Sequence, residues 1–229
     1  MPLALFKDLC IDAADPTALG GFWAAALGLH LEVHDDDQDA HLTGPTQAHT
    51  IWINRVPEPK TVKHRVHLDV HGDSVALLEA LGATVIDDAS FPWVVMADPE
   101  GGEFCLFLRE EVPAQRLYEV VIDCADHAGA SAWWHEMLGG DRVCDERGFS
   151  YIRAVPDLPC DSLDFIPVPE AKAAKNRIHL DVQGPDRQAV LAHGATLLRA
   201  RDEEIGWDVM ADPEGNEFCF FTVDGSPAT

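Results

Sequence analysis

Two pairs of short phrases bring together residue types that can move protons or bind metal ions. The phrases VMADPEGGEFCLF (residues 95–107) and VMADPEGNEFCFF (residues 209–221) each carry a glutamate and a cysteine two positions apart, directly after a turn signal. The phrases RVHLDV (residues 65–70) and RIHLDV (residues 177–182) carry a histidine and an aspartate with the same spacing. Because side chains alternate between the two faces of a strand, each pair shares one face. The pattern predicts a strand face that displays carboxylate, imidazole and thiol groups.

A hairpin must position the glutamate and the cysteine. Residues 98–101, with the sequence DPEG, have Asp first, Pro second and Gly fourth, which is typical of a type I turn. In the strand that follows, Phe104 and Leu106 are predicted to pack beneath a helix, opposite the polar face. Glu100 and its counterpart Glu214 are expected at solvated hairpin tips.

The rest of each copy alternates helical and strand patterns. Residues 5–12, LFKDLCID, alternate as a half-buried strand does, with Asp8, Cys10 and Asp12 on one face. Asp15-Pro16 is a typical helix start, and apolar residues recur at helical spacing from there to Gly28. Three short strand patterns follow before the order restarts. The sequence therefore predicts an α+β chain of four units, each a strand, a helix and three strands.

The chain repeats itself at an offset of about 112 residues. IDAADPTALGGFWAAALG at residues 11–28 aligns with IDCADHAGASAWWHEMLG at residues 122–139, and the phrases quoted above recur at a similar offset. A period of this length predicts two domains with their own cores rather than a solenoid. We delimit the first copy as residues 1–110, a polar linker as residues 111–116 and the second copy as residues 117–229.

Composition excludes several classes of function. The 229 residues include 40 Asp and Glu against 16 Lys and Arg, a formal charge of −24, so nucleic acid and anionic membranes are not expected partners. No apolar run is long enough to span a bilayer, and the N-terminus becomes acidic too early for a secretory signal. The six cysteines form no CxxC pair and are expected to be reduced. These features favour a cytoplasmic protein.

The paired units, with an HLDV strand followed by a DPEGNEF hairpin, resemble the vicinal oxygen chelate (VOC) superfamily. This superfamily includes glyoxalase I, extradiol dioxygenases and bleomycin resistance proteins, and the chain is most similar to its glyoxalase-like domains, here in tandem. The resemblance extends from about Leu3 to Val223. It implies four βαβββ units that pair into two cup-shaped, incompletely closed mixed β barrels. It also implies a small-molecule ligand, and a divalent metal in the cup where the protein is an enzyme.

The resemblance implies a candidate ligand set for each copy. The family ligand of the first strand corresponds to Asp8 in the first copy and to Glu119 in the second. The histidine ligand of the fifth strand corresponds to His67 and His179. The last family ligand, usually a glutamate, is replaced by Cys105 and Cys219.

A carboxylate, an imidazole and a thiolate suit Zn²⁺ and leave a position open for substrate, while Ni, Co, Mn and Fe remain compatible. A thiolate suits Fe(II) dioxygen chemistry poorly, so a dioxygenase is disfavoured. Glu103 and Glu217 are the candidate acids that would move a proton. Trp52, Trp93 and Trp207 are candidate substrate-binding residues.

Structural interpretations of the same residues stay open. Cys105 and Cys219 are also compatible with small core residues. The histidines are compatible with buried hydrogen-bonding roles. For Asp69 and Asp181, the preferred interpretation is a structural ion pair with Arg65 and Arg177, four positions earlier on the same strand face, or a cap.

Two functions therefore remain. One is a metal-dependent lyase or isomerase of glyoxalase type, acting on vicinal oxygens. The alternative is a metal-free protein that sequesters a drug or metabolite, as bleomycin resistance proteins do, in which case no cofactor is expected. In both, the chain is expected to be a monomer with an internal pseudo-dimer, or a homodimer.

Overall fold

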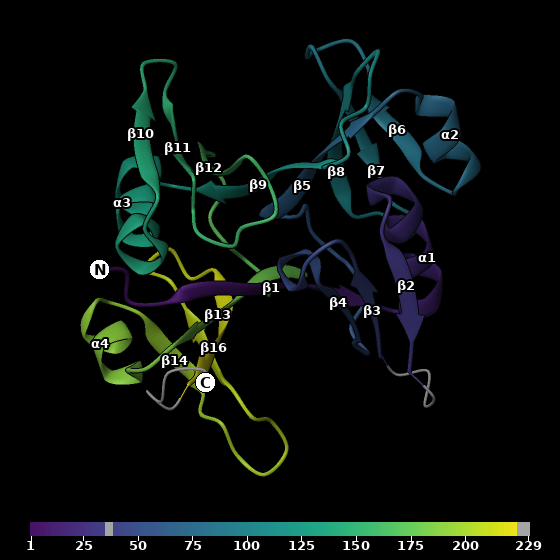
Figure 1. Cartoon of the computed structure of the whole chain (residues 1–229). Coiled ribbons are helices and arrows are strands. Elements are labelled where there is room, and N and C mark those ends of the chain that lie inside the picture. Colours follow the sequence, from purple (N-terminus) through teal and green to yellow (C-terminus); the bar gives the residue numbers. More distant parts are fainter. Residues whose placement is uncertain (35–38, 224–229) are drawn as a thin grey trace.

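The computed structural model describes residues 1–34 and 39–223 and folds them into two eight-stranded sheets (Figure 1). The first sheet has the strand order β14-β15-β16-β13-β1-β4-β3-β2. Its strands are β1 (Leu5–Ala13), β2 (His30–Val33), β3 (Asp39–Thr43), β4 (Ile51–Arg55), β13 (Ile178–Gly184), β14 (Thr196–Arg199), β15 (Asp208–Ala211) and β16 (Glu217–Thr222).

The second sheet has the equivalent order β10-β11-β12-β9-β5-β8-β7-β6. Its strands are β5 (Val66–Gly72), β6 (Thr84–Asp87), β7 (Val94–Ala97), β8 (Glu103–Leu108), β9 (Leu117–Cys124), β10 (Asp141–Asp145), β11 (Phe149–Arg153) and β12 (Ser162–Pro167). The α helices are α1 (Pro16–Leu27), α2 (Val75–Ala80), α3 (His127–Leu138) and α4 (Arg187–Ala192), and a 3₁₀ turn, η1, covers Gln47–His49. The predicted order of strand, helix and three strands is confirmed in all four units.

Each sheet combines strands from both sequence copies. The first sheet joins the first unit of copy one to the last unit of copy two through the antiparallel pair β1 and β13. The second sheet joins the two middle units through the antiparallel pair β5 and β9. Neither sheet closes on itself, as predicted for incomplete barrels. We call the concave side of the sheet with β1 and β13 the first cup, and that of the sheet with β5 and β9 the second cup.

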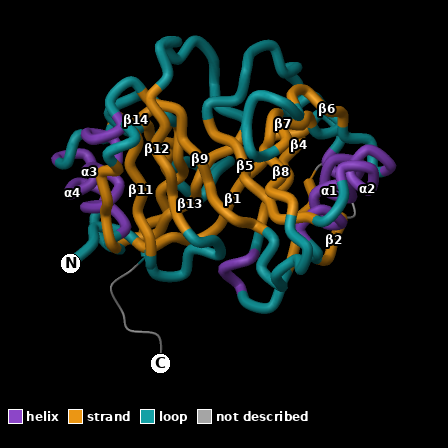
Figure 2. The backbone as a smooth tube through the Cα atoms, turned by 90° about the horizontal axis from the view of Figure 1, so that it is seen from above, coloured by secondary structure: helices purple, strands orange, loops and turns teal. Residues whose placement is uncertain are grey.

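The helices group by sequence copy. Figure 2 shows α1 and α2 at one end of the molecule and α3 and α4 at the other, with the central strands between them. No helix of the described residues is long and apolar enough to cross a bilayer; α1 and α3 have 12 residues each.

Local sequence explains where α1 begins and ends. The Asp15 carboxylate accepts a hydrogen bond from the Ala18 N–H at 3.0 Å, and Pro16 occupies the first turn. Gly28 ends the helix with φ +70°, a left-handed conformation that favours glycine. The start and end of α1 thus follow the sequence prediction.

Aromatic packing joins helix to sheet within each copy. The rings of Phe22 and Trp23 on α1 lie 5.8 and 5.3 Å from the ring of Phe104 on β8. In the second copy, Trp134 on α3 lies 5.5 Å from Phe218 on β16, in an edge-on arrangement. Edge-on contacts add to the free energy gained by burying these large apolar rings. Within each copy, these contacts connect a helix over one sheet to a strand of the other sheet, and the buried apolar residues of both copies form one cluster.

The hairpin-tip glutamates are not solvated as expected, because they bind helix starts. The Glu100 carboxylate accepts hydrogen bonds from the main-chain N–H groups of Ala14 and Asp15 at 2.8–2.9 Å. Glu214 does the same for Ala125 and Asp126. A negative charge at a helix N-terminus satisfies donors that have no partner inside the helix. These contacts connect the last hairpin of each copy, in one sheet, to the first helix of the same copy, over the other sheet.

Two equivalent connections line a pocket of about 560 Å³. Residues 58–65 contribute from the first connection and residues 168, 170, 171 and 173–177 from the second, together with Asp12 and Asp123. His64 lies at its wall with 7% of its surface exposed, and neither ring nitrogen has a hydrogen-bond partner among the described residues. Burial lowers the pKa of His64 to about 4, although the carboxylate of Glu103 acts in the opposite direction. Copy two has Asn176 at the equivalent place, bonded to Asn216.

Replacing Glu100 by alanine should lower the free energy of unfolding by about 1–2 kcal/mol, because two main-chain donors lose a charged acceptor. Urea denaturation at neutral pH measures the change. Glu146→Ala, in the exposed turn between β10 and β11, is the matched control and should stay within about 0.5 kcal/mol of the wild type. Equal effects of the two substitutions would contradict the helix-start role of Glu100.

His64 should make stability depend on pH. Its pKa is lower in the folded chain than in the unfolded chain, so between pH 6.5 and 4 the unfolded state binds more protons. Stability should therefore fall as pH drops through this window, by on the order of 2–3 kcal/mol. His64→Asn should flatten this part of the pH profile, whereas His30→Asn, on an exposed strand, should not. An unchanged profile in His64→Asn would show that another group causes the loss.

Candidate functional site

Strand register brings the polar residues of the first cup together. In the β1–β13 pair, Cys10 lies opposite His179 and Asp8 lies opposite Asp181. In the parallel β13–β16 pair, Asp181 lies beside Cys219. Since these residues occupy alternate strand positions, their side chains share the concave face while the apolar residues between them pack beneath the helices.

The structure groups the expected ligands across the copies and not within them. Asp8 shares the first cup with His179 and Cys219, whereas the expected set paired it with His67 and Cys105. Glu119 correspondingly lies in the second cup, opposite Asp69 and on the same sheet as His67 and Cys105. The per-copy sets were wrong because β1 pairs with β13 of the other copy, a choice of strand partner that no local pattern specifies.

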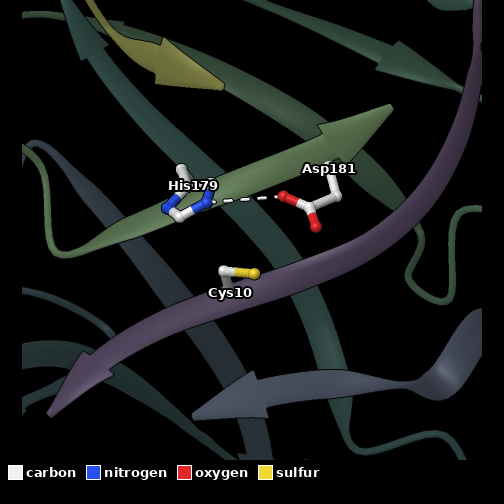
Figure 3. A group of neighbouring side chains, drawn as sticks. All are labelled: Cys10, His179 and Asp181. Atoms are coloured by element: carbon white, nitrogen blue, oxygen red, sulfur yellow. Dashed lines mark ion pairs between the residues drawn. The ribbon is translucent and has the colours of Figure 1, made fainter. Parts of the chain in front are cut away.

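Cys10, His179 and Asp181 form a compact group in the first cup (Figure 3). One possible ligand atom from each residue lies within 4.8 Å of those of the other two. The His179 Nε2 atom is 3.4 Å from the Asp181 Oδ1 atom and 3.3 Å from the Cys219 Sγ atom. All four side chains are buried, with 3–8% of their surface exposed.

Two atoms of this group, Asp181 Oδ1 and His179 Nδ1, have no hydrogen-bond partner among the described residues. Burial raises the pKa of the Cys10 thiol to about 12, and Asp181 adds to the effect. Burial also raises the pKa of Cys219, although its hydrogen bond with His179 lowers it. Burial alone would lower the pKa of His179, but the neighbouring Cys10 and Asp181 raise it well above its usual value.

Asp8 lies beside this group but has its own partner. Its carboxylate pairs with the Lys7 ammonium, which also lies 4.4 Å from the centre of the Phe221 ring. The register of β1 against β13 shifts between Phe6 and Asp8, so Lys7 occupies an irregular position in the strand. The family ligand position of the first strand is thus occupied by an ion pair in this cup.

The second cup has a related but different group. His67, Asp69 and Cys105 place one possible ligand atom each within 4.8 Å of the others, and His67 Nε2 lies 3.4 Å from Asp69 Oδ1. The Asp69 Oδ1 atom has no hydrogen-bond partner among the described residues. Val121 lies opposite His67, where the first cup has Cys10 opposite His179.

Carboxylates surround the group in the second cup. Burial, together with the neighbouring Asp164 and Asp69, raises the pKa of Glu119 to about 8. Burial also raises the pKa of Asp164 to about 6, although the Ser162 hydroxyl donates a hydrogen bond to it at 2.5 Å. Repulsion among these acids makes the second cup receptive to a cation or a proton near neutral pH.

Asp69 and Asp181 do not make the ion pairs expected of them. Each approaches the histidine two positions earlier, at 3.4 Å. Arg65 and Arg177 instead donate to main-chain oxygens of Asp123 and Asp12 at 2.9 and 3.1 Å. The ion-pair prediction was wrong because the arginines lie at the strand ends, within reach of the opposite sequence copy.

Glu103 and Glu217, the expected proton-transfer acids, bind the connections that line the pocket. Glu103 pairs with Lys60 at 2.9 Å and accepts a hydrogen bond from the His64 N–H at 2.9 Å. Glu217 pairs with Lys172 at 2.7 Å and accepts from the Asn176 N–H at 3.1 Å. Burial raises the pKa of Glu103, but these hydrogen bonds and the Lys60 charge lower it by more, so the pKa is lowered overall. A proton-transfer role for either acid stays untested.

Aromatic side chains line the outer parts of both cups. Trp52 on β4 stacks on His41 with the ring centres 4.8 Å apart. Trp93 stacks on Phe107 at 5.3 Å, and Trp207 stacks on Phe221 at 5.4 Å. Flat, stacked rings can bind an apolar or aromatic ligand. The substrate-binding role of the three tryptophans remains a prediction.

The residues of both cups fit a divalent cation. Each group offers an imidazole, a carboxylate and at least one thiol, and each contains a buried carboxylate oxygen without a hydrogen-bond partner among the described residues. These are the ligand types of zinc sites. Sequence reasoning placed Cys10 on the correct strand face but did not consider it as a ligand, because the family pattern drew attention to Asp8. It also treated Asp181 as structural.

Comparison with known proteins gives the same fold. The glyoxalase-like domain family matches residues 8–107 and 119–221. Glyoxalase I from Zea mays superposes with a TM-score of 0.70 at 13% identity, covering 96% of this chain and 92% of that one. A proposed dioxygenase from Bacillus subtilis subsp. subtilis str. 168 superposes with a TM-score of 0.63 at 16% identity, covering 98% and 86%. No curated protein sequence matches significantly. With two family domains spanning most of its length, the chain belongs to the glyoxalase-like family of the VOC superfamily.

Proposed function

We propose that the chain binds a small organic molecule with adjacent oxygen atoms in a cup and uses a divalent cation to transform it by lyase or isomerase chemistry. The observation that carries the proposal is the group of histidine, aspartate and cysteine on each concave face, in which a buried aspartate oxygen approaches the histidine at 3.4 Å but has no hydrogen-bond partner among the described residues. Buried polar atoms are normally satisfied, so an atom without a partner calls for an explanation such as an ion.

The protein residues would divide the work as follows. His179 and Asp181 in the first cup, and His67 and Asp69 in the second, would hold the cation together with the cysteines. When bound, the cation would act as a Lewis acid on the vicinal oxygens of the ligand. Among divalent metals, zinc suits these thiol-containing groups best. The same groups are poor ligands for an Fe(II) ion that reacts with dioxygen.

Proton transfer in the second cup is best assigned to Glu119. Its carboxyl group lies on the concave face opposite Asp69, beside the proposed cation, where it could exchange a proton with a bound ligand as general acid–base catalysis requires. Glu103 is held as a carboxylate by Lys60 and the His64 N–H, which makes it a weaker base. Glu119 therefore takes the role that sequence reasoning gave to Glu103.

Metal-free sequestration is the second candidate function. The stacked aromatic pairs in both cups favour it, because they offer flat apolar surfaces to an aromatic ligand. The formal charge of −24 would attract a cationic ligand. All six cysteines are free thiols, which suits a reducing compartment such as the cytoplasm for either function.

Elemental analysis of untagged protein tests the metal proposal. The wild type should contain near-stoichiometric Zn, Ni, Co, Mn or Fe, and the His67→Ala/His179→Ala double variant should lose it because both groups lose their imidazole. His30→Ala is the control and should keep the metal, with circular dichroism confirming the fold of each variant. Wild-type protein that is metal-free and takes up no added cation would contradict this proposal and favour sequestration.

The chain should work as a monomer, because both cups are completed by strands from the same molecule. Light scattering after size-exclusion chromatography should give a mass near 25.1 kDa at micromolar concentration. A stable mass of twice that value would show that an additional interface between two chains contributes to the assembly.

A further inference from the structure

The two cups differ at one strand position, and this difference changes their coordination chemistry. In the first cup, Cys10 faces His179 across the β1–β13 pair. At the same place in the second cup, Val121 faces His67. The first cup therefore offers two thiols, those of Cys10 and Cys219, where the second offers only that of Cys105.

We propose that the first cup holds a closed, structural zinc ion bound by Cys10, His179, Asp181 and Cys219, and that the small-molecule ligand binds in the second cup. The inference rests on the proposed use of a divalent cation and assigns a separate role to each cup. Four protein ligands fill a tetrahedral zinc site, whereas a catalytic site keeps one position open. His67, Asp69 and Cys105 in the second cup are three ligands and leave such a position.

Two interatomic distances at His179 in the first cup are close to those of tetrahedral zinc. Ordinary zinc bond lengths and a tetrahedral angle separate an imidazole nitrogen from a carboxylate oxygen by about 3.4 Å and from a thiolate sulfur by about 3.6 Å. The His179 Nε2 atom lies 3.4 Å from Asp181 Oδ1 and 3.3 Å from Cys219 Sγ. The Cys10 ligand atom is within 4.8 Å of those of His179 and Asp181. Cys219 lies outside this group of three, so side-chain rotation must bring its sulfur and that of Cys10 to one ion. Figure 3 shows the Cys10 sulfur beside the line that joins His179 and Asp181.

The two cups also differ in how accessible their histidine side chains are to solvent. Cys10, His179 and Asp181 are all buried, as is Cys219 at 7% exposure. In the second cup Asp69 and Cys105 are buried as well, but the His67 side chain keeps 15% of its surface accessible, against 10% for the His179 side chain. A substrate needs access to its metal, but a structural ion does not. The more accessible His67 group, with Glu119 beside it, is therefore the better place for the ligand.

Packing alone does not require a cysteine at position 10. Valine occupies the equivalent place in the second cup with 4% exposure, close to the 3% of Cys10, so an apolar side chain of similar size fits this part of the fold. Cys10→Val thus removes a proposed zinc ligand and introduces the side chain that Val121 has at the equivalent position of the second cup. Cys105→Val is the matched control, because it removes the thiol of the other cup.

The test combines zinc content with cobalt spectroscopy on full-length protein. Wild type should retain one zinc per chain after dialysis against EDTA, and Cys105→Val should retain it too. Cys10→Val and His179→Ala should lose it, with zinc affinity lowered more than the 10–100-fold typical of changes to outer-shell partners. With Co²⁺ in place of zinc, the wild type should show intense tetrahedral bands and thiolate charge-transfer absorption. Cys10→Ser should weaken both while it keeps the size of the side chain. Zinc removal should lower the unfolding temperature of the wild type but not that of Cys10→Val.

The outcomes separate this inference from the proposed function. Zinc that survives in Cys10→Val but is lost in Cys105→Val or His67→Ala would overturn the first-cup site and leave the metal proposal standing. Two zinc ions of equal resistance to EDTA would overturn the division of roles. Wild type that binds neither zinc nor cobalt would overturn both proposals.

Discussion

The antiparallel pairing of strands from opposite sequence copies is the constraint on which the rest of the molecule depends. β1 pairs with β13, and β5 pairs with β9, so each sheet exists only when both copies are folded together. Arg65 and Arg177 reinforce these pairs by donating to main-chain oxygens of the opposite copy. The register of each pair also places histidine opposite Cys10 in one cup and opposite Val121 in the other. Pairing between copies thus determines both the architecture and the chemistry of the cups.

The helix layer opposes any separation of the two sheets. Each copy packs the aromatic residues of its first helix against its own last strand, which belongs to the other sheet. Glu100 and Glu214 add charged hydrogen bonds at the same junctions. Strands therefore join copy to copy, while helices and hairpin tips join sheet to sheet. Separating the two copies would break the strand pairs, and separating the two sheets would break the helix and hairpin contacts.

This connectivity allows the two cups to diverge without a change of fold. The concave faces contribute little to the apolar core beneath the helices, so polar replacements there are compatible with the same packing. The first cup has two thiols and an ion pair between Lys7 and Asp8. The second has three acids, and burial together with the neighbouring carboxylates raises the pKa values of Glu119 and Asp164. One scaffold thus carries a thiol-rich group and a carboxylate-rich group related by an internal repeat.

The sequence by itself determined the local structure of this protein: the four repeated units, the strand faces that carry His67 and Cys105, the start of α1 at Asp15 and the DPEG turns. These features depend on strand alternation, helix capping and turn preferences within a few residues, and such local preferences can be recognised directly in the sequence. Only the tertiary structure decided that Asp8 shares a sheet with His179 and not with His67, that Cys10 joins the first group and that Glu103 binds Lys60. Strand partners distant in sequence are selected by the summed burial and hydrogen bonding of a whole sheet, and no short stretch of sequence contains that sum.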